Sequence, residues 1–520
     1  MRPWLRPALL AFSIASALVL SETARAEPDQ SKRQPNILFA LADDWSWPHA
    51  SIANAMGVPG SDSVVKTPVF DRIARAGVLF TNAYCSAPSC SPSRSAILTG
   101  RNVWELETAA NLRGVLPAKF GIYPDALEAV GYHVGFIRKG WSPGVLGEQT
   151  RNPAGPRFES FEEFMEKRPE GKPFSFWFGS KDAHRGYERD SGIRSGMDPN
   201  AVAIPAGLPD DPIVRRDLCD YYYEVERFDT ELGAMLDMIE ARGELSNTIV
   251  VIAGDNGLPF PRCKVELYDT GTRVPLAIAW GDTIKGGRVV DDFVNLAELG
   301  PTFLEVAGLK PFDTMTVKSL MNILSSDQQG QVDPQRDKVF TGREYHDFEC
   351  RADDTGYPQR AMRTADYLYI RNYEPDRWPA GDPVVFREKR GIFGEVDQSP
   401  TKTYMIDHRD DPEVKELYRL SFDKRPGEEL YDLQKDPGQL INVAALPEYA
   451  ERKSELVAVF EREFGAVYDP AALGIPPRPA DVTYNVSAKA SAAKDPKSKD
   501  VSRSLGTKKP ISKNKDNTKE

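Results

Sequence analysis

The chain has 520 residues, which is long enough for one large α/β domain and a smaller companion. Its net charge is −11, and this acidic balance disfavours nucleic acid as a partner, so any anionic ligand must be bound by a local basic pocket. Five cysteines exclude a disulfide framework, although one or two bridges remain possible, and none has the CxxC spacing of a structural zinc site.

The first 26 residues have the form of a secretory signal peptide. Arg2 and Arg6 precede the apolar run 8–20, and Ala24-Arg25-Ala26 supplies the small residues of a cleavage site. The apolar run is shorter than the roughly 20 residues that a bilayer-spanning helix needs, which disfavours a membrane anchor. We therefore expect cleavage after Ala26 and a periplasmic or extracellular protein without stable membrane insertion.

Apolar strands alternate with helices over the next part of the chain. The predicted strands lie at 35–44, 174–178 and 248–253, and the predicted helices at 68–76 and 217–243. Pro68 suits the first turn of a helix, and Gly243 suits a helix end. This alternation predicts a doubly wound sheet whose chemistry lies at the carboxyl ends of the strands.

Two of these strands end in oxygen-bearing side chains. Asp43-Asp44 ends the first strand, and Asp255-Asn256 follows the third. Three carboxylates and an amide oxygen suit a hard cation such as calcium or magnesium. Only five histidines occur in the chain, which argues against a two-zinc phosphatase site. Either pair taken alone is typical of a helix cap or a tight turn, so the prediction depends on their occurring together.

The run Cys90–Arg101, CSPSRSAILTGR, lies between the first two strands. Its Ser-Pro-Ser stretch opens a helix and places Cys90 near the positive N-terminus, which suits an anion. Arg94 lies one turn further on the same helix face. Taken alone, a CxPxR pattern more often marks a buried and inert cysteine.

Beyond about residue 350 the pattern changes to a smaller α+β unit. Strands are predicted at Met362–Arg371, Lys415–Phe422 and Glu428–Leu433, and a helix at Pro447–Phe464. From about Val486 the composition predicts a disordered, lysine-rich tail. The predicted division is therefore a signal peptide at 1–26, a catalytic domain at 27–350, a C-terminal subdomain with an antiparallel sheet at 351–484 and the tail at 485–520.

The Cys90 run, the two acid pairs and the stretch after Asn256 together resemble the type I sulfatases. The resemblance implies an alkaline-phosphatase-like fold, with a large mixed sheet flanked by helices. It also implies that a formylglycine-generating enzyme converts Cys90 to formylglycine (3-oxoalanine) during maturation. A hydrated aldehyde is a better nucleophile than an encoded hydroxyl, because one oxygen attacks and the other later expels the product. The implied metal ligands are Asp43, Asp44, the converted Cys90, Asp255 and Asn256.

The same resemblance implies the remaining roles. Arg94 would hold the hydrated aldehyde, and Lys139 and Lys264 would neutralise charge on the sulfuryl group. Asp255 would assist deprotonation of the attacking hydroxyl, and His184 would protonate the leaving group. The family normally has a histidine after the first lysine, but Gly140-Trp141-Ser142-Pro143 has none. That histidine helps to dismantle the sulfated intermediate, and Asp255, His184 or a bound water are the candidates for its role.

Within the family, CSPSR, Asp255–Pro261 and Asp182–Arg185 look most like the N-sulfoglucosamine sulfohydrolases, which implies hydrolysis of N-sulfate in heparan-type glycans. An exo O-sulfatase on sulfated polysaccharide stays open as an alternative. A phosphonate or phosphodiester hydrolase of the same fold and a catalytically dead glycan-binding protein also stay open. The stretch Gly342–Asp347 could contact a sugar at the pocket rim or form salt bridges between domains.

Overall fold

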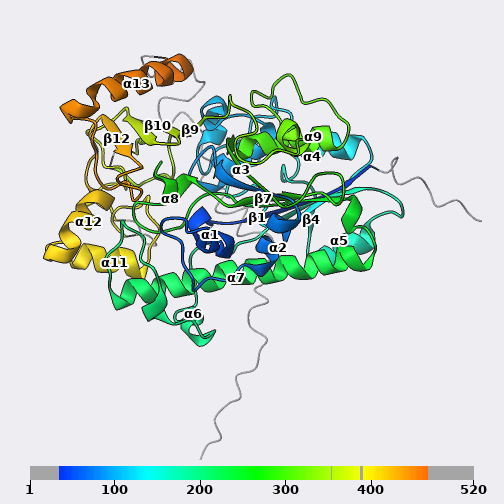
Figure 1. Cartoon of the computed structure of the whole chain (residues 1–520), viewed down its shortest axis with the longest axis horizontal. Coiled ribbons are helices and arrows are strands. Elements are labelled where there is room, and N and C mark those ends of the chain that lie inside the picture. The colour runs from blue at the N-terminus through cyan, green and yellow to red at the C-terminus, as the bar shows by residue number, and fades with distance from the viewer. Residues whose placement is uncertain (1–33, 353, 387–390, 466–520) are drawn as a thin grey trace, which may run out of the picture.

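The computed structural model describes residues 34–465, except residue 353 and residues 387–390. Two β-sheets organise these residues, with helices packed around the larger one (Figure 1). The predicted signal peptide and lysine-rich tail lie outside the described residues. Inside the described ranges, no helix combines the length and the apolar character needed to cross a bilayer.

The large sheet has eight strands in the order β4-β3-β5-β1-β6-β7-β2-β8. Strand β7 runs antiparallel to β6 and β2, and all other neighbours are parallel. The bounds are β1 Asn36–Ala42, β2 Val78–Tyr84, β3 His133–Arg138, β4 Arg157–Phe158, β5 Phe174–Gly179, β6 Thr248–Gly254, β7 Leu276–Ala279 and β8 Arg288–Asn295. The predicted large mixed sheet is thus confirmed, and the three predicted strands are β1, β5 and β6.

The central strands are apolar on both faces because helices cover both faces of the sheet. Every residue of β1, which reads NILFALA, is buried. Alternate residues enter different core clusters, with Phe39 on one face and Leu38 on the other. This follows the two-residue period of a strand, and continuous apolar runs are typical of buried parallel strands.

The 30-residue helix α7 (Pro212–Ala241) packs on the Leu38 face, where Phe228 joins the core. Helices α4 (Tyr123–Ala129) and α9 (Leu299–Val306) pack on the Phe39 face (Figure 1). The predicted helices at 68–76 and 217–243 are confirmed as α2 (Pro68–Ala76) and α7. The other α-helices that precede β9 in the chain are α1 Ser51–Ala55, α3 Cys90–Thr99, α5 Phe161–Lys167, α6 Ser191–Arg194, α8 Asp269–Thr272 and α10 Met321–Leu324. Short 3-10 helices lie at Trp47–His49, Val103–Glu105, Glu107–Ala110, Pro199–Ala201, Leu245–Asn247, Leu296–Glu298 and Pro447–Tyr449.

The small sheet is antiparallel, in the order β12-β11-β10-β9. Its strands are β9 Lys338–Arg343, β10 Gln359–Thr364, β11 Tyr367–Asn372 and β12 Glu428–Asp432. Helix α13 (Ala450–Phe464) packs on it through Phe460, which contacts Tyr369. The predicted antiparallel sheet, the strand at 428–433 and the C-terminal helix are confirmed. The chain enters this sheet at β9, before the predicted boundary at residue 350.

Two predicted strands of this region are wrong. Met362–Arg371 is two strands, β10 and β11, joined by a tight turn in which Thr364 Oγ1 accepts a hydrogen bond from the Tyr367 amide at 3.1 Å. Lys415–Phe422 lies in helix α12 (Pro412–Phe422), next to α11 (Pro400–Asp407). Its apolar residues, Val414, Leu417, Tyr418 and Phe422, follow helical spacing and pack on the large core.

All five cysteines are buried free thiols. None of the bridges that the cysteine count allowed is therefore formed.

Candidate active site

Polar side chains follow the carboxyl ends of four neighbouring strands, β3, β5, β1 and β6. Because these strands are parallel and adjacent, their ends meet at one edge of the sheet. Strand β2 runs in the same direction and leads into α3. This edge brings together every residue that the sequence assigned to the site: Asp43, Asp44, Cys90, Arg94, Lys139, His184, Asp255, Asn256 and Lys264.

Asp43, Asp44, Asp255 and Asn256 form what we call the acidic cluster. The pairing of β1 with β6 places the two acid pairs side by side, and the Asp44 amide donates to Asp255 Oδ1 at 3.0 Å. Carboxylate oxygens of the three aspartates lie within 4.8 Å of one another, and all three side chains are buried. Burial and the charge of Asp43 raise the pKa of Asp255 to about 6. Burial would also raise the pKa of Asp43. The charges of Lys139 and other nearby cations outweigh burial and hold the pKa of Asp43 well below its ordinary value.

The acidic cluster supplies the oxygen ligands that a divalent cation site needs. Asn256 Nδ2 donates to Asp44 Oδ1 at 2.7 Å, whereas Asn256 Oδ1 is buried and has no hydrogen-bond partner in the described part of the chain. A buried carbonyl oxygen without a hydrogen bond lowers the free energy of unfolding by about 1–3 kcal/mol. A hard cation with oxygen ligands would satisfy it, so the residues present fit calcium or magnesium.

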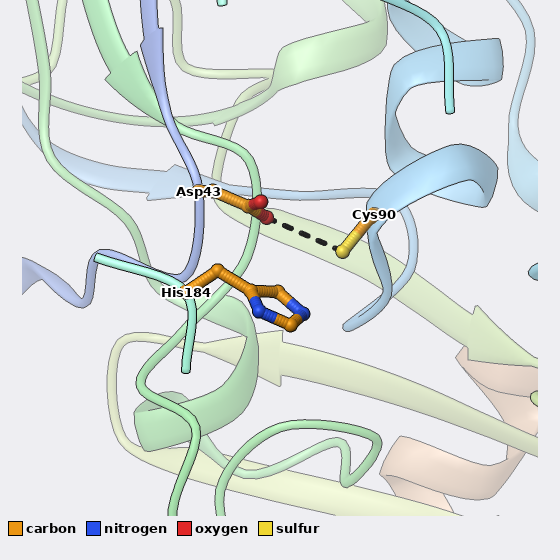
Figure 2. Close-up of side chains that lie close together, drawn as sticks. All are labelled: Asp43, Cys90 and His184. Atoms are coloured by element: carbon orange, nitrogen blue, oxygen red, sulfur yellow. Dashed lines mark hydrogen bonds between the residues drawn. The ribbon is translucent and has the colours of Figure 1, made fainter. Parts of the chain in front are cut away.

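Cys90 is the first residue of α3, and it is 2% exposed. Its Sγ lies 3.3 Å from Asp43 Oδ1, and Figure 2 shows the imidazole of His184 beside this pair. Burial, together with the charge of Asp43, raises the pKa of the Cys90 thiol to about 12. The encoded side chain is therefore a neutral thiol near neutral pH, and a neutral thiol is a poor nucleophile. The site thus favours a reacting group other than the thiol at residue 90.

Each aspartate of the acidic cluster contacts one cation. The three ion pairs are Lys139 with Asp43, Lys264 with Asp44 (2.8 Å) and Arg94 with Asp255 (2.8 Å). Burial alone would lower the pKa of these cations, but the neighbouring carboxylates outweigh it and raise the pKa of all three. The site therefore holds three permanent positive charges in a chain whose net charge is negative.

Arg94 links α3 to the acidic cluster and also donates to the carbonyl oxygens of Lys139 and Gly140, at 2.6 and 2.9 Å. We expect Arg94→Ala to lower the free energy of unfolding by about 3–5 kcal/mol, because it leaves the Asp255 carboxylate buried without its ion pair. Urea denaturation measures this loss. In the control Arg419→Ala, the exposed ion pair with Glu416 disappears and the expected change is below about 1 kcal/mol. Equal stability of both variants would contradict the prediction.

His184 lies in the loop after β5, and this loop is hydrogen-bonded to the end of β1. The Asp43 amide donates to the Asp182 carbonyl at 2.9 Å, and the Ala183 amide donates to the Asp43 carbonyl at 2.7 Å. Arg185 anchors the loop from the other side through two hydrogen bonds to Asp217, at 2.7 and 3.0 Å. The imidazole of His184 is thereby held beside Asp43 and Cys90.

A cavity of about 650 Å³ opens over Cys90, a size typical of small-ligand sites. Its lining includes four further cationic side chains, Arg113, Arg138, Lys181 and Arg227. It also includes His346, which the sequence had indicated only as part of the stretch Gly342–Asp347. Asp397, which no sequence signal marked, contacts Lys264 Nζ at 3.2 Å.

The sulfatase family model matches residues 35–161 and 157–309, more than half of the chain. The chain belongs to the sulfatase family. The predicted resemblance is confirmed, and this sulfatase is a hydrolase of sulfate esters. A second model, the C-terminal domain of N-sulphoglucosamine sulphohydrolase, matches residues 263–383 of the sulfatase. The family uses formylglycine and a divalent metal, for which the acidic cluster is suited.

Curated relatives of the sulfatase act on different sugars. An ulvan-active sulfatase of Formosa agariphila is 26% identical over 486 residues, which cover 85% of this chain and 76% of the relative. Human N-sulphoglucosamine sulphohydrolase is 25% identical over 482 residues, 81% of this chain and 88% of the human one. N-acetylglucosamine-6-O-sulfatase of Bacteroides thetaiotaomicron is 23% identical, over 81% of this chain and 94% of that protein.

Solved structures share the fold at low sequence identity. One, in complex with its substrate D-glucosamine-2-N,6-O-disulfate, has a TM-score of 0.55 at 18% identity and covers 83% of the sulfatase and 98% of its own chain. The phosphonate monoester hydrolase of Silicibacter pomeroyi has a TM-score of 0.60 at 15% identity, with coverage of 83% and 95%. At these identities the structures establish the fold alone.

Proposed function

We propose that this sulfatase is exported and removes the N-sulfate of glucosamine in heparan-type glycans, with a formylglycine made from Cys90 and a calcium ion in the acidic cluster. The observation that carries sulfate hydrolysis is the convergence of three cations and an all-oxygen cluster around residue 90. The preference for N-sulfate is supported by the match of residues 263–383 and by the human relative. Export is supported by the predicted signal peptide.

The cations at the site are placed to bind a sulfuryl group. Formylglycine supplies an oxygen nucleophile, and the divalent ion supplies charge neutralisation for it and for a sulfate oxygen. Lys139 and Lys264 stabilise negative charge that grows on the sulfuryl oxygens, a contribution that is usually the largest in such sites. We assign Arg94 to hold the oxygen at residue 90, since its Nη2 is buried, has no hydrogen-bond partner in the described ranges and is available for that contact.

Two side chains move protons in this proposal. The Asp255 carboxylate takes the proton of the attacking hydroxyl at residue 90, and the imidazole of His184 gives a proton to the departing nitrogen or oxygen. His184 is suited to the second role because it lines the cavity while its loop is fixed to the end of β1.

An exo O-sulfatase is the second candidate. It is favoured by the relatives that are named as an N-acetylglucosamine-6-O-sulfatase and as ulvan-active sulfatases. The structural likeness to a phosphonate monoester hydrolase also keeps phosphonate hydrolysis among the activities to be measured.

Peptide mass spectrometry and a substrate panel test the proposal. The tryptic peptide 76–94 contains Cys85 as well as Cys90, so fragmentation has to show an aldehyde at residue 90 and an intact thiol at residue 85. The panel compares N-sulfoglucosamine, glucosamine 6-sulfate, an aryl sulfate and an aryl phosphonate. Turnover of the 6-sulfate without turnover of N-sulfoglucosamine would replace the first candidate by the second. An unconverted Cys90 in the native protein, with no turnover, would indicate a glycan-binding protein.

We expect His184→Gln to lower kcat on N-sulfoglucosamine by about 10²–10⁴-fold, because the departing amine needs a proton. On 4-nitrophenyl sulfate the loss should be much smaller, because nitrophenolate leaves without protonation. Steady-state kinetics on both substrates measure the difference. Equal losses on the two substrates would assign His184 to binding rather than to proton donation.

A further inference from the structure

The segment after Lys139 has no group that can transfer a proton at the site. Trp141 is 1% exposed, and its Nε1 donates to Ser95 Oγ of α3 at 2.8 Å, so the indole serves the packing of that helix. Ser142 and Pro143 line the cavity, but neither is a base near neutral pH. A base for the second half of the reaction must therefore come from another segment.

His346 lies in the cavity wall and contacts the segment that carries Cys90. Its Nδ1 is hydrogen-bonded to Ser89 Oγ at 2.9 Å. Its carbonyl accepts a hydrogen bond from the Leu112 amide at 3.1 Å, and the Leu112 carbonyl in turn contacts Ser91 Oγ. His346 thus lines the same 650 Å³ cavity as Cys90, and its imidazole is hydrogen-bonded to the residue that precedes Cys90.

Three successive contacts hold His346 in this place. The Tyr345 amide donates to Asn111 Oδ1 at 3.2 Å. The His346 carbonyl accepts from the Leu112 amide, as described above. The Asp347 carboxylate accepts from Arg113 Nε at 3.0 Å. Residues 345–347 therefore lie along residues 111–113, which follow α3. Behind them the buried Glu395 accepts from the Asp347 amide at 3.3 Å. These contacts fix the backbone on both sides of His346, and the hydrogen bond to Ser89 orients its imidazole.

We propose that His346 is a catalytic residue that releases sulfate from residue 90. Its Nε2 takes the proton of the free hydroxyl on the hydrated carbon of residue 90. A C=O bond forms as the bond from that carbon to the sulfate-bearing oxygen breaks, and sulfate leaves with the electron pair. The proton passes to water, and addition of water to the C=O restores the hydrate. This assignment rests on the proposed function and leaves Asp255 and His184 to the first half of the reaction.

The test compares His346→Asn with the wild type on 4-nitrophenyl sulfate, with rates normalised to the formylglycine content of each preparation. Asparagine retains a polar atom near the Nδ1 position that meets Ser89, and it lacks Nε2. We expect a burst of about one nitrophenol per formylglycine, followed by a steady rate about 10²-fold below that of the wild type. Peptide 76–94, isolated after acid quenching, should carry one additional sulfuryl group. His184→Gln should show neither the burst nor the added group.

Two further variants separate catalysis from folding. Ser89→Ala keeps His346 and removes only its partner, and Ser89 forms no side-chain cap on α3, so we expect normal folding with a smaller accumulation of sulfated peptide. His408→Asn, which changes an exposed histidine at the C-terminal end of α11, should match the wild type. A wild-type steady rate in His346→Asn, or a slow rate without burst and sulfated peptide, would overturn the assignment. A wild type that converts Cys90 but hydrolyses no sulfate would instead refute the proposed function.

Discussion

Cys90→Ala should lower kcat/KM for every sulfate ester by about 10⁵-fold or more, because it removes the oxygen nucleophile that we propose at residue 90. The three cations and the acidic cluster do not depend on this side chain, so binding of free sulfate as a competitive ligand should change little. Kinetics with an aryl sulfate, together with sulfate titration by calorimetry, would measure the two quantities on the same preparation.

The matched control is Cys85→Ala, which removes another buried thiol five positions away in the same tryptic peptide. Its Sγ donates to the Gly271 carbonyl at 3.9 Å, whereas the Sγ of Cys90 lies against Asp43. We expect this variant to keep the wild-type kcat. Activity of Cys90→Ala at more than a small fraction of the control would show that residue 90 is not the nucleophile.

Removal of divalent metal should abolish sulfatase activity, by about 10³-fold or more, while the fold survives. The reason is that Asp43, Asp44 and Asp255 each form an ion pair with a cationic side chain, so none of these three carboxylates is buried without a counter-charge when the metal is removed. Chelation followed by gel filtration, with circular dichroism and aryl sulfate assays on the same sample, would check both parts. Calcium should restore the rate at lower concentration than magnesium.

Asn256→Ala provides the companion variant for metal binding. It removes Oδ1, the buried oxygen that lacks a partner among the described residues, and should raise the calcium concentration needed for half-maximal activity. Loss of stability in this variant without a shift in the calcium requirement would argue for a structural role. Full activity of thoroughly chelated wild type would remove the metal from the proposal.

The central part of the fold could be predicted from the sequence because a strand buried on both faces consists of a continuous run of apolar residues, which is easy to recognise. Asp43 and Asp255 follow such runs directly, so a prediction of the strands β1 and β6 also placed the acidic cluster at one sheet edge. Lys139 and Lys264 have no local signal of this kind, and only the likeness to known motifs marked them. The structure brings both to the edge and pairs each with an aspartate.

Long-range contacts explain what the sequence did not predict. His346 reaches the cavity because residues 345–347 lie along residues 111–113, and the Arg113–Asp347 bond joins positions 234 apart in the chain. No periodicity or motif near His346 encodes that contact. The error at Lys415–Phe422 has a different cause. Over only eight residues, the apolar positions of a half-buried helix and those of a half-exposed strand are hard to distinguish.

Burial of helix α3 has a consequence for the order of events in biosynthesis. All ten residues from Cys90 to Thr99 are buried, and the Cys90 thiol lies in the cavity wall against Asp43. A modifying enzyme that recognises this stretch as an extended peptide has no access to it once the sheet is complete. The conversion that we propose for Cys90 would therefore have to precede folding, and a chain that folded unconverted would stay inactive until it unfolded again.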